Sequence, residues 1–257
     1  MRPVALITHL PDRDAGLIRE CLAAEGCPVL ECNPLDGTEL PGLADVSGIV
    51  SLGGRESATE LDRYPFLVAE VALMKDALEH GVPVLGMCLG AQLLALAAGG
   101  RVSRIGTVYA GWAELSMTSD GRADPVFGEL SDRLRVLKWH EDEIELPRLA
   151  TVLGDTSSPG IALFRVGPAA WGSQMHLEVT PGMLVDGWLS EDVGVSEIEA
   201  AGHEIDQFRA ESIATLPAQM AESRPVFSRF AELVRGVGLA RPGAAGAARL
   251  PRAEAVS

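Results

Sequence analysis

Continuous apolar runs alternate with amphipathic segments along the first hundred residues. The runs are Val4–Thr8, Pro28–Cys32, Gly48–Gly54 and Val82–Met87. They lack the alternation of a half-exposed strand and therefore predict parallel strands that are buried on both faces. The segments that follow them predict helices at Asp14–Ala24, Pro65–His80 and Ala91–Ala98. This βαβ alternation indicates an α/β fold, in which a mainly parallel sheet carries helices on both faces.

The pattern changes after Gly100, where short alternating strands appear with turn residues between them. We expect these strands at Arg101–Ile105, Ala113–Thr118, Leu134–Trp139, Ala150–Gly154, Ile161–Val166 and Ala170–His176. Alternation is typical of antiparallel strands, so they should extend the sheet largely through antiparallel pairs. A further helix is predicted after them, with Thr180 as N-cap, Pro181 at the first position and an end near Leu189.

The chain divides into three predicted parts. Residues 1–190 form the α/β domain, and the acidic helical residues 191–237 are expected to pack on or beside it. Residues 238–257 have low complexity and few large apolar groups, which predicts disorder. The predicted packing positions of the helical part are Ile198, Ile205, Phe208, Ile213, Phe227, Phe230, Leu233 and Val234.

The stretch Gly86-Met87-Cys88-Leu89-Gly90 joins a predicted strand to a predicted helix. A nucleophile with a glycine two residues away on either side is the pattern of a nucleophile elbow, a tight turn that lifts the side chain out of the sheet. The turn also places the sulfur at the positive end of a helix, where a thiolate is favoured. We therefore predict that Cys88 is a catalytic nucleophile. The alternative is a buried thiol that only packs.

A catalytic thiol needs a base, and the base needs an acceptor that orients it. His176 closes a predicted strand and is followed two residues later by Glu178. In extended backbone these side chains share a face, so Glu178 can hold one imidazole nitrogen while the other faces the thiol. His80 is interpreted as a helix-end residue and His203 as a surface group. His9 lies near the carboxyl edge of the sheet, where it could contact a site.

An oxyanion hole requires backbone N–H groups that point at the reacting carbonyl oxygen. Leu89, in the first turn after the elbow, offers one such N–H group. Gly53 and Gly54 end a strand that should neighbour the elbow strand, and glycine permits a close backbone approach there. A double glycine alone is a weak signal, because it is usually only a loop.

Composition narrows the classes of function. A formal net charge of −15 argues against nucleic acid and anionic membranes, because both demand a basic surface. The N-terminus enters a strand without a basic and apolar leader, and no apolar run approaches a spanning length, so we expect a cytoplasmic protein. Cys21, Cys27 and Cys32 match neither a zinc site nor a disulfide framework. We predict no metal and no cofactor.

Four motifs in this order resemble the class I glutamine amidotransferases. They are Gly53-Gly54, Gly86–Gln92, Trp139-His140-Glu141-Asp142 and the segment 174–181, Gln-Met-His-Leu-Glu-Val-Thr-Pro. The resemblance covers about residues 1–190 and is nearest to free-standing members similar to the glutaminase part of GMP synthase. It implies a three-layer, flavodoxin-like α/β fold with an antiparallel extension of the sheet.

The resemblance also implies a reaction and the residues that carry it. A triad of Cys88, His176 and Glu178 would attack the side-chain amide of glutamine, form a γ-glutamyl thioester, release ammonia and hydrolyse the thioester to glutamate. The oxyanion donors map to Gly53, Gly54 and Leu89. The residues that hold the substrate map to Gln92, Trp139, His140 and Glu141.

Two departures from the family pattern concern the substrate-binding residues. Arg55 stands where many relatives carry proline, and Glu141 replaces the glycine of a His-Gly-Asp pattern. A carboxylate at 141 could block glutamine or favour a cationic substrate. Ile161 stands where relatives often have glutamine.

Three hypotheses therefore stay open. The first is a cysteine amidohydrolase that acts on glutamine and passes ammonia to a separate synthase, because this chain carries no ATP-binding loop. The second is a hydrolase of other γ-glutamyl amides or peptides. The third is a non-catalytic regulatory subunit on the same fold, with the helices at 191–237 as a partner surface or a lid.

Overall fold

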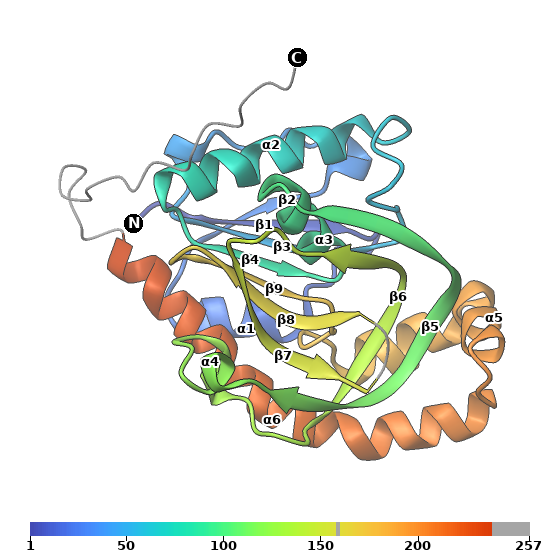
Figure 1. Cartoon of the computed structure of the whole chain (residues 1–257). Coiled ribbons are helices and arrows are strands. Elements are labelled where there is room, and N and C mark those ends of the chain that lie inside the picture. The colour runs from blue at the N-terminus through green and yellow to red at the C-terminus, as the bar shows by residue number, and fades with distance from the viewer. Residues whose placement is uncertain (158–159, 238–257) are drawn as a thin grey trace.

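The parallel half of the structure is built from β1 (Val4–His9), β2 (Val29–Cys32), β3 (Gly48–Gly54), β4 (Val84–Met87) and β9 (Ala170–Ser173). The antiparallel half is built from β5 (Arg101–Met117), β6 (Arg135–Glu145), β7 (Ala150–Thr156) and β8 (Ile161–Val166). In the residues that this computed structural model describes, 1–157 and 160–237, these nine strands form one sheet in the order β2-β1-β3-β4-β9-β8-β7-β5-β6 (Figure 1). The mixed α/β fold is therefore confirmed, while the predicted disordered tail at 238–257 lies outside the described residues.

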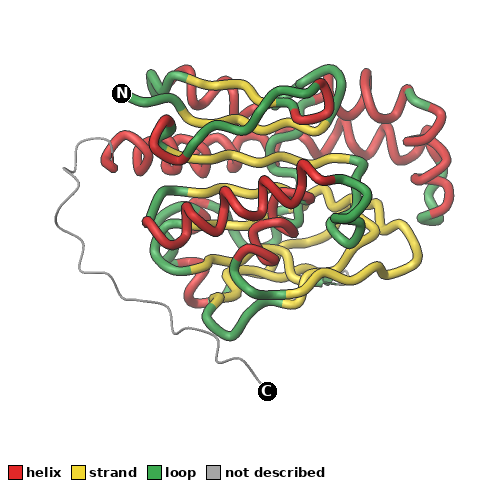
Figure 2. The backbone as a smooth tube through the Cα atoms, turned by 90° about the horizontal axis from the view of Figure 1, so that it is seen from above, coloured by secondary structure: helices red, strands yellow, loops and turns green. Residues whose placement is uncertain are grey.

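Helices cover both faces of this sheet. They are α1 (Gly16–Ala24), α2 (Pro65–His80), α3 (Leu89–Ala97), α4 (Ser119–Arg122), α5 (Asp192–Ala200) and α6 (Ile205–Val237), with short 3₁₀ turns at Pro34–Asp36, Leu43–Asp45, Phe127–Glu129 and Trp188–Ser190. Figure 1 shows α2 and α3 on one side of the parallel strands and α1 and α6 on the other, and Figure 2 shows the same layers from above.

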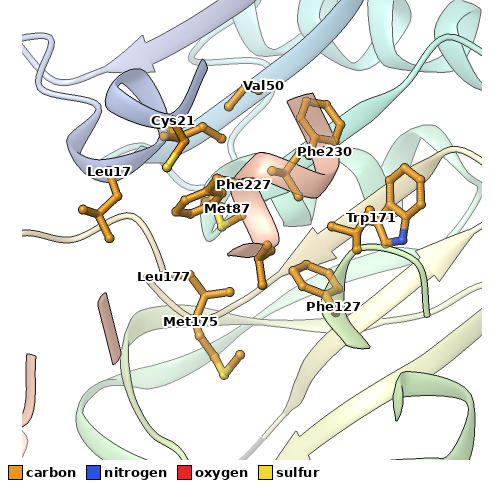
Figure 3. Close-up of a cluster of buried hydrophobic side chains, with 14 of the residues drawn as sticks. Leu17, Cys21, Val50, Met87, Phe127, Trp171, Met175, Leu177, Phe227 and Phe230 are labelled. Atoms are coloured by element: carbon orange, nitrogen blue, oxygen red, sulfur yellow. The ribbon is translucent and has the colours of Figure 1, made fainter. Parts of the chain in front are cut away.

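Two apolar clusters hold the layers together. On one face, Phe227 and Phe230 of α6 pack with Leu17 and Cys21 of α1 and with Met87 of β4 (Figure 3). On the other face, side chains of α2 and α3 pack against β1, β3 and β4. Burial of this kind contributes about 25 cal/mol per Å² of apolar surface, which makes it the main force that fixes the strands. Within the described part of the chain, no helix combines the length and apolarity that a membrane span requires.

The predicted second half needs correction in its strand boundaries. The strands expected at Arg101–Ile105 and Ala113–Thr118 form one strand, β5, because the residues between them remain extended beside β6. The register of that pair shifts between Arg104 and Tyr109, so the bulge hides the alternation in the sequence. Strand β9 ends at Ser173 instead of His176.

The helical part also differs from the prediction. The helix expected after Thr180 is a π-helix at Gly182–Gly187, and the Thr180 hydroxyl accepts the Met183 N–H at 3.3 Å, as a capping residue does. The segment 194–235 is two helices, α5 and α6, separated at Gly202 with φ of 90°. Ile213 is 56% exposed, so its predicted packing role is wrong. It lies away from the α6 face that buries Ser212, Leu216 and Gln219.

Candidate active site

The turn between β4 and α3 has the geometry of a nucleophile elbow. Cys88 has φ 49° and ψ −106°, a strained conformation for a residue with a side chain. A Cβ atom on Gly86 would lie 2.4 Å from the backbone oxygen of Gly90, and one on Gly90 would lie 2.2 Å from that of Ser51. Neither position therefore has room for a side chain, which explains both glycines around the nucleophile.

His176 and Glu178 lie together after the end of β9. Nδ1 of His176 donates to Oε1 of Glu178 across 2.9 Å, and the two residues are 5% and 2% exposed. The pairing predicted from the spacing is therefore present, although β9 ends before His176. The Leu17 N–H at the start of α1 donates to the Glu178 carbonyl at 2.9 Å and fixes this backbone.

Gln219 of α6 holds the backbone of His176 from the opposite side. The His176 N–H donates to the Leu137 carbonyl at 2.9 Å, and the Leu137 N–H donates to the Gln219 side-chain oxygen at 2.9 Å. The Gln219 amide nitrogen then donates to the His176 carbonyl at 2.8 Å. A helix beyond residue 191 therefore helps to place the candidate base.

The carbonyl of Trp139 in β6 is an acceptor for both Cys88 and His176. The Cys88 sulfur lies 3.5 Å from this oxygen, and Nε2 of His176 lies 3.4 Å from it. Because a carbonyl oxygen only accepts, Nε2 carries a hydrogen, as Nδ1 does toward Glu178. The imidazole is therefore protonated on both nitrogens in this arrangement.

Charge explains why His176 keeps both protons. Burial alone would lower its pKa, but the negative charges of Cys88 and Glu178, together with hydrogen bonds to both, raise the pKa of His176 well above its ordinary value. The site thus favours a thiolate beside an imidazolium, which is the reactive form of a cysteine nucleophile.

The predicted oxyanion residues lie beside this pair. A Cβ atom on Gly53 would lie 3.1 Å from Cε1 of His176 and 3.6 Å from Cβ of Cys88. Gly54 is equally confined, because a Cβ atom there would lie 2.6 Å from Cβ of His9. Leu89 is the first residue of α3, so its N–H has no acceptor within the helix. The backbone of these residues can thus approach a small substrate closely.

A cavity of about 360 Å³ opens above Cys88. The structure brings to its wall every site residue that the sequence predicts, which are Cys88, His176, Glu178, Gly53, Gly54, Leu89, Gln92, Trp139, His140 and Glu141. The cavity lies where the carboxyl ends of the parallel strands meet, the usual position of a ligand site in an open α/β sheet. In the described ranges no group of three or more His, Cys, Asp or Glu side chains could hold a metal ion.

Gln92 and His140 are the buried polar groups predicted to hold substrate. Gln92 is 3% exposed, and its amide nitrogen donates to the side-chain oxygen of Gln174 at 3.4 Å. Burial, then the positive charge of Lys138, lowers the pKa of His140 to about 4. Nδ1 of His140 donates to the Asp142 carbonyl at 3.0 Å, while its Nε2 is buried without a hydrogen bond. His140 is therefore a neutral group with a free acceptor on the cavity wall.

Glu141 does not project as an unpaired charge. Its carboxylate lies 3.4 Å from the Arg104 guanidinium, and the same guanidinium contacts Asp142 at 3.4 Å. Asp142 in turn accepts the Ser57 hydroxyl at 2.6 Å, which ties the segment 139–142 to the loop after β3. Arg104 thus balances the carboxylate that departs from the family pattern.

Sequence reasoning missed the segment 188–197, which we call the cover segment. Its residues Trp188, Val193, Gly194 and Glu197 line the cavity. Trp188 packs edge-on against His176 with ring centroids 5.1 Å apart, and the Trp139 indole N–H donates to Glu197 at 2.7 Å. Arg55 forms an ion pair with Glu191 in this segment. A tryptophan just beyond the motif at 174–181 was the one available signal.

Comparison with known proteins agrees with this geometry. A subunit of the glutamine-hydrolyzing GMP synthase of Haloarcula marismortui is 33% identical over 146 residues, which cover 56% of this chain and 70% of that protein. A glutamine amidotransferase structure from Thermotoga maritima is 29% identical with a TM-score of 0.79, covering 90% of this chain and 98% of its own. One from Methylobacillus flagellatus is 25% identical with a TM-score of 0.82, covering 95% and 98%.

The family match spans the elements that build the cavity. The family model of glutamine amidotransferase class-I matches residues 17–193, from α1 to the start of α5. This range includes the elbow, the strands whose carboxyl ends form the site and the pair after β9. On this match the chain belongs to the class-I glutamine amidotransferase family.

Proposed function

We propose that this chain hydrolyses the side-chain amide of glutamine to glutamate and ammonia through a γ-glutamyl thioester on Cys88. The observation that carries the proposal is the buried His176–Glu178 pair at 2.9 Å, beside a cysteine held in an elbow at the floor of a cavity. Membership of the class-I family supplies the substrate class.

The first half of the reaction forms the thioester. The Cys88 thiolate attacks the side-chain carbonyl carbon of glutamine, and the electrons of the C=O bond move to the oxygen. Nε2 of His176 then gives its proton to the amide nitrogen as the C–N bond breaks, so ammonia leaves. Glu178 keeps the proton on Nδ1 and stabilises the imidazolium throughout.

The second half releases glutamate. Water attacks the thioester carbonyl and gives a proton to Nε2 of His176, which acts as base. The C–S bond then breaks, and its electron pair returns to sulfur as thiolate. Backbone N–H groups of Gly53, Gly54 and Leu89 are the proposed donors to the oxyanion in both halves, because their residues lie beside the nucleophile.

Substrate recognition is the less direct part of the proposal. Gln92 and the segment 139–142 lie at the cavity wall and are proposed to hold the glutamyl group. The pairing of Glu141 with Arg104 leaves this carboxylate less available to a cationic substrate. We therefore place glutamine ahead of other γ-glutamyl amides as the substrate.

We further propose that the ammonia passes to a separate synthase. The relative from Haloarcula marismortui is named as one subunit of a glutamine-hydrolyzing GMP synthase, which supports a partner of that kind. The complete triad argues against the alternative of a purely regulatory subunit.

The test measures release of glutamate and ammonia from glutamine by the wild-type chain and by Cys88→Ala. We expect turnover in the wild type and none in the variant. Unchanged turnover in Cys88→Ala would exclude the elbow cysteine as nucleophile. Absence of glutamine turnover together with hydrolysis of γ-glutamyl amines, reversed toward glutamine by Glu141→Gly, would replace glutamine by the second substrate class.

A further inference from the structure

His9 lies at the end of β1, directly beside the proposed oxyanion residues. It is 1% exposed and lines the cavity. In the β1–β3 pairing His9 is the partner of Gly54, and a Cβ atom on Gly54 would lie 2.6 Å from Cβ of His9. A buried histidine at this position is not used by the triad and needs its own explanation.

Both ring nitrogens of His9 meet groups that accept hydrogen bonds. Nδ1 lies 3.2 Å from the Leu52 carbonyl oxygen, and Nε2 lies 2.9 Å from Oε2 of Glu70 in α2. A carbonyl oxygen and a carboxylate both accept, so each nitrogen donates and the ring is an imidazolium. Glu70 is as deeply buried as His9, so the two form a neutral pair inside the protein.

The pair closes a hydrogen-bonded loop on β3. The second oxygen of Glu70 accepts the Ser51 hydroxyl at 2.6 Å. Ser51 and Leu52 are consecutive residues, so this loop fixes the strand at the two positions that precede Gly53. Burial works against the charge on His9, but Glu70 from α2 and Glu56 from the loop after β3 raise its pKa above the ordinary value.

The planarity of the peptide bond converts this contact into a constraint on the oxyanion hole. The Leu52 carbonyl and the Gly53 N–H belong to one peptide unit, and in a trans peptide they point in opposite directions. A donor that fixes the Leu52 oxygen therefore also aims the Gly53 N–H. A charged donor on that oxygen polarises the same unit and makes the N–H a stronger donor.

We propose that His9 is a positioning residue that, through Glu70 and the Leu52 carbonyl, orients the Gly53 N–H toward the oxyanion. The inference rests on the proposed function. It predicts that loss of His9 slows both halves of the reaction while substrate binding and the thiolate stay intact, since the triad lies on other elements.

The experiment compares His9→Phe, which keeps a ring without donors, with His9→Gln, which keeps one N–H donor without charge. We expect kcat for glutamine to fall about 100-fold in His9→Phe with KM within twofold, and by less in His9→Gln. Glu70→Gln should lower kcat in the same direction. His80→Gln is the matched control and should not change kcat, because His80 is exposed and contacts the Asp76 carbonyl in α2.

A second measurement separates positioning from general damage. Alkylation of Cys88 by iodoacetamide develops no oxyanion, so its rate should be unchanged in His9→Phe and His9→Gln. Alkylation that slows in parallel with kcat, or a kcat within twofold of wild type in a folded variant, would overturn the role of His9 and leave the function standing. A wild-type chain without glutamine turnover would overturn both.

Discussion

A Cβ atom on Gly90 would lie 2.2 Å from the backbone oxygen of Ser51, so α3 and β3 meet at a distance that only glycine allows. Gly90→Ala should therefore displace the elbow or the strand, lower the free energy of unfolding by about 3 kcal/mol and abolish turnover. Urea unfolding and glutamate release measure the two effects. Gly236→Ala, where nothing lies within 4 Å, is the control and should leave both values near wild type. A fully active and equally stable Gly90→Ala would contradict the close approach.

This contact also shows why the sequence carried so much information about the elbow. Two steric requirements, at Gly86 and Gly90, each exclude every residue but glycine, so the chemistry and the turn leave one shared signature. The predicted bounds of β3 and α2 are those of the structure, since Gly54, Pro65 and Gly81 mark their ends in the sequence. Strong local signals of this kind are readable without knowledge of the partner elements.

Elements defined by distant partners were predicted less well. Strand β5 runs through Gly106 because β6 pairs with it on both sides of the bulge, and no residue within β5 reveals that partner. The cover segment lies over the cavity because of contacts such as Trp139 with Glu197, which are 58 residues apart. Tertiary contacts of this type have no periodic signature along the chain, so sequence patterns alone do not reveal them.

The four cysteines should differ in reactivity. Burial raises the pKa of the thiols of Cys21, Cys27 and Cys32, whereas Cys88 lies on the cavity wall beside the His176 imidazolium. Iodoacetamide at pH 7 should therefore label Cys88 at least about tenfold faster than the others, as peptide mass spectrometry can show. His176→Ala should slow this labelling, and bound glutamine should protect Cys88. Equal labelling of Cys21 would argue against a selective thiolate.

Lys138 gives the protein a pH dependence that can be isolated. Burial lowers its pKa from 10.5 to about 8. Between pH 8 and pH 10.5 the unfolded chain binds more protons than the folded chain at this residue, so its contribution to stability rises with pH. The free energy of unfolding of wild type, relative to Lys138→Met, should therefore increase by up to about 3 kcal/mol across that range. Urea unfolding at both limits measures it, and Lys75→Met, an exposed site, should show no such difference.

The ion pair between Arg55 and Glu191 joins the loop after β3 to the cover segment. Both side chains are about half exposed, so the pair should add less than about 1 kcal/mol to stability. Its loss in Arg55→Met should instead loosen the cover segment and raise KM for glutamine by about fivefold with a similar melting temperature. Added salt should bring the wild-type KM toward that of the variant. Glu20→Gln removes a pair of similar exposure with Arg224 and should not affect KM. An unchanged KM in Arg55→Met would separate this pair from substrate binding.

Gln219 shows how a residue far from the family motifs can set the geometry of the triad. Its side chain accepts the Leu137 N–H and donates to the His176 carbonyl, so Gln219→Leu leaves two buried backbone groups without partners. We expect the free energy of unfolding to fall by about 3 kcal/mol and kcat to fall more than tenfold as His176 loses its fixed position.

Gln219→Glu distinguishes these two effects. A carboxylate still accepts the Leu137 N–H but cannot donate to the His176 carbonyl, so only the contact to the base is lost. This variant should therefore lose kcat at neutral pH and regain part of it at lower pH, where the carboxyl is protonated and donates again. Steady-state kinetics from pH 5 to pH 8 measure this recovery. Gln207→Leu, on an exposed face of the same helix, should behave as wild type. If Gln219→Leu retained wild-type kcat in a folded chain, α6 would support the fold without contributing to the placement of His176.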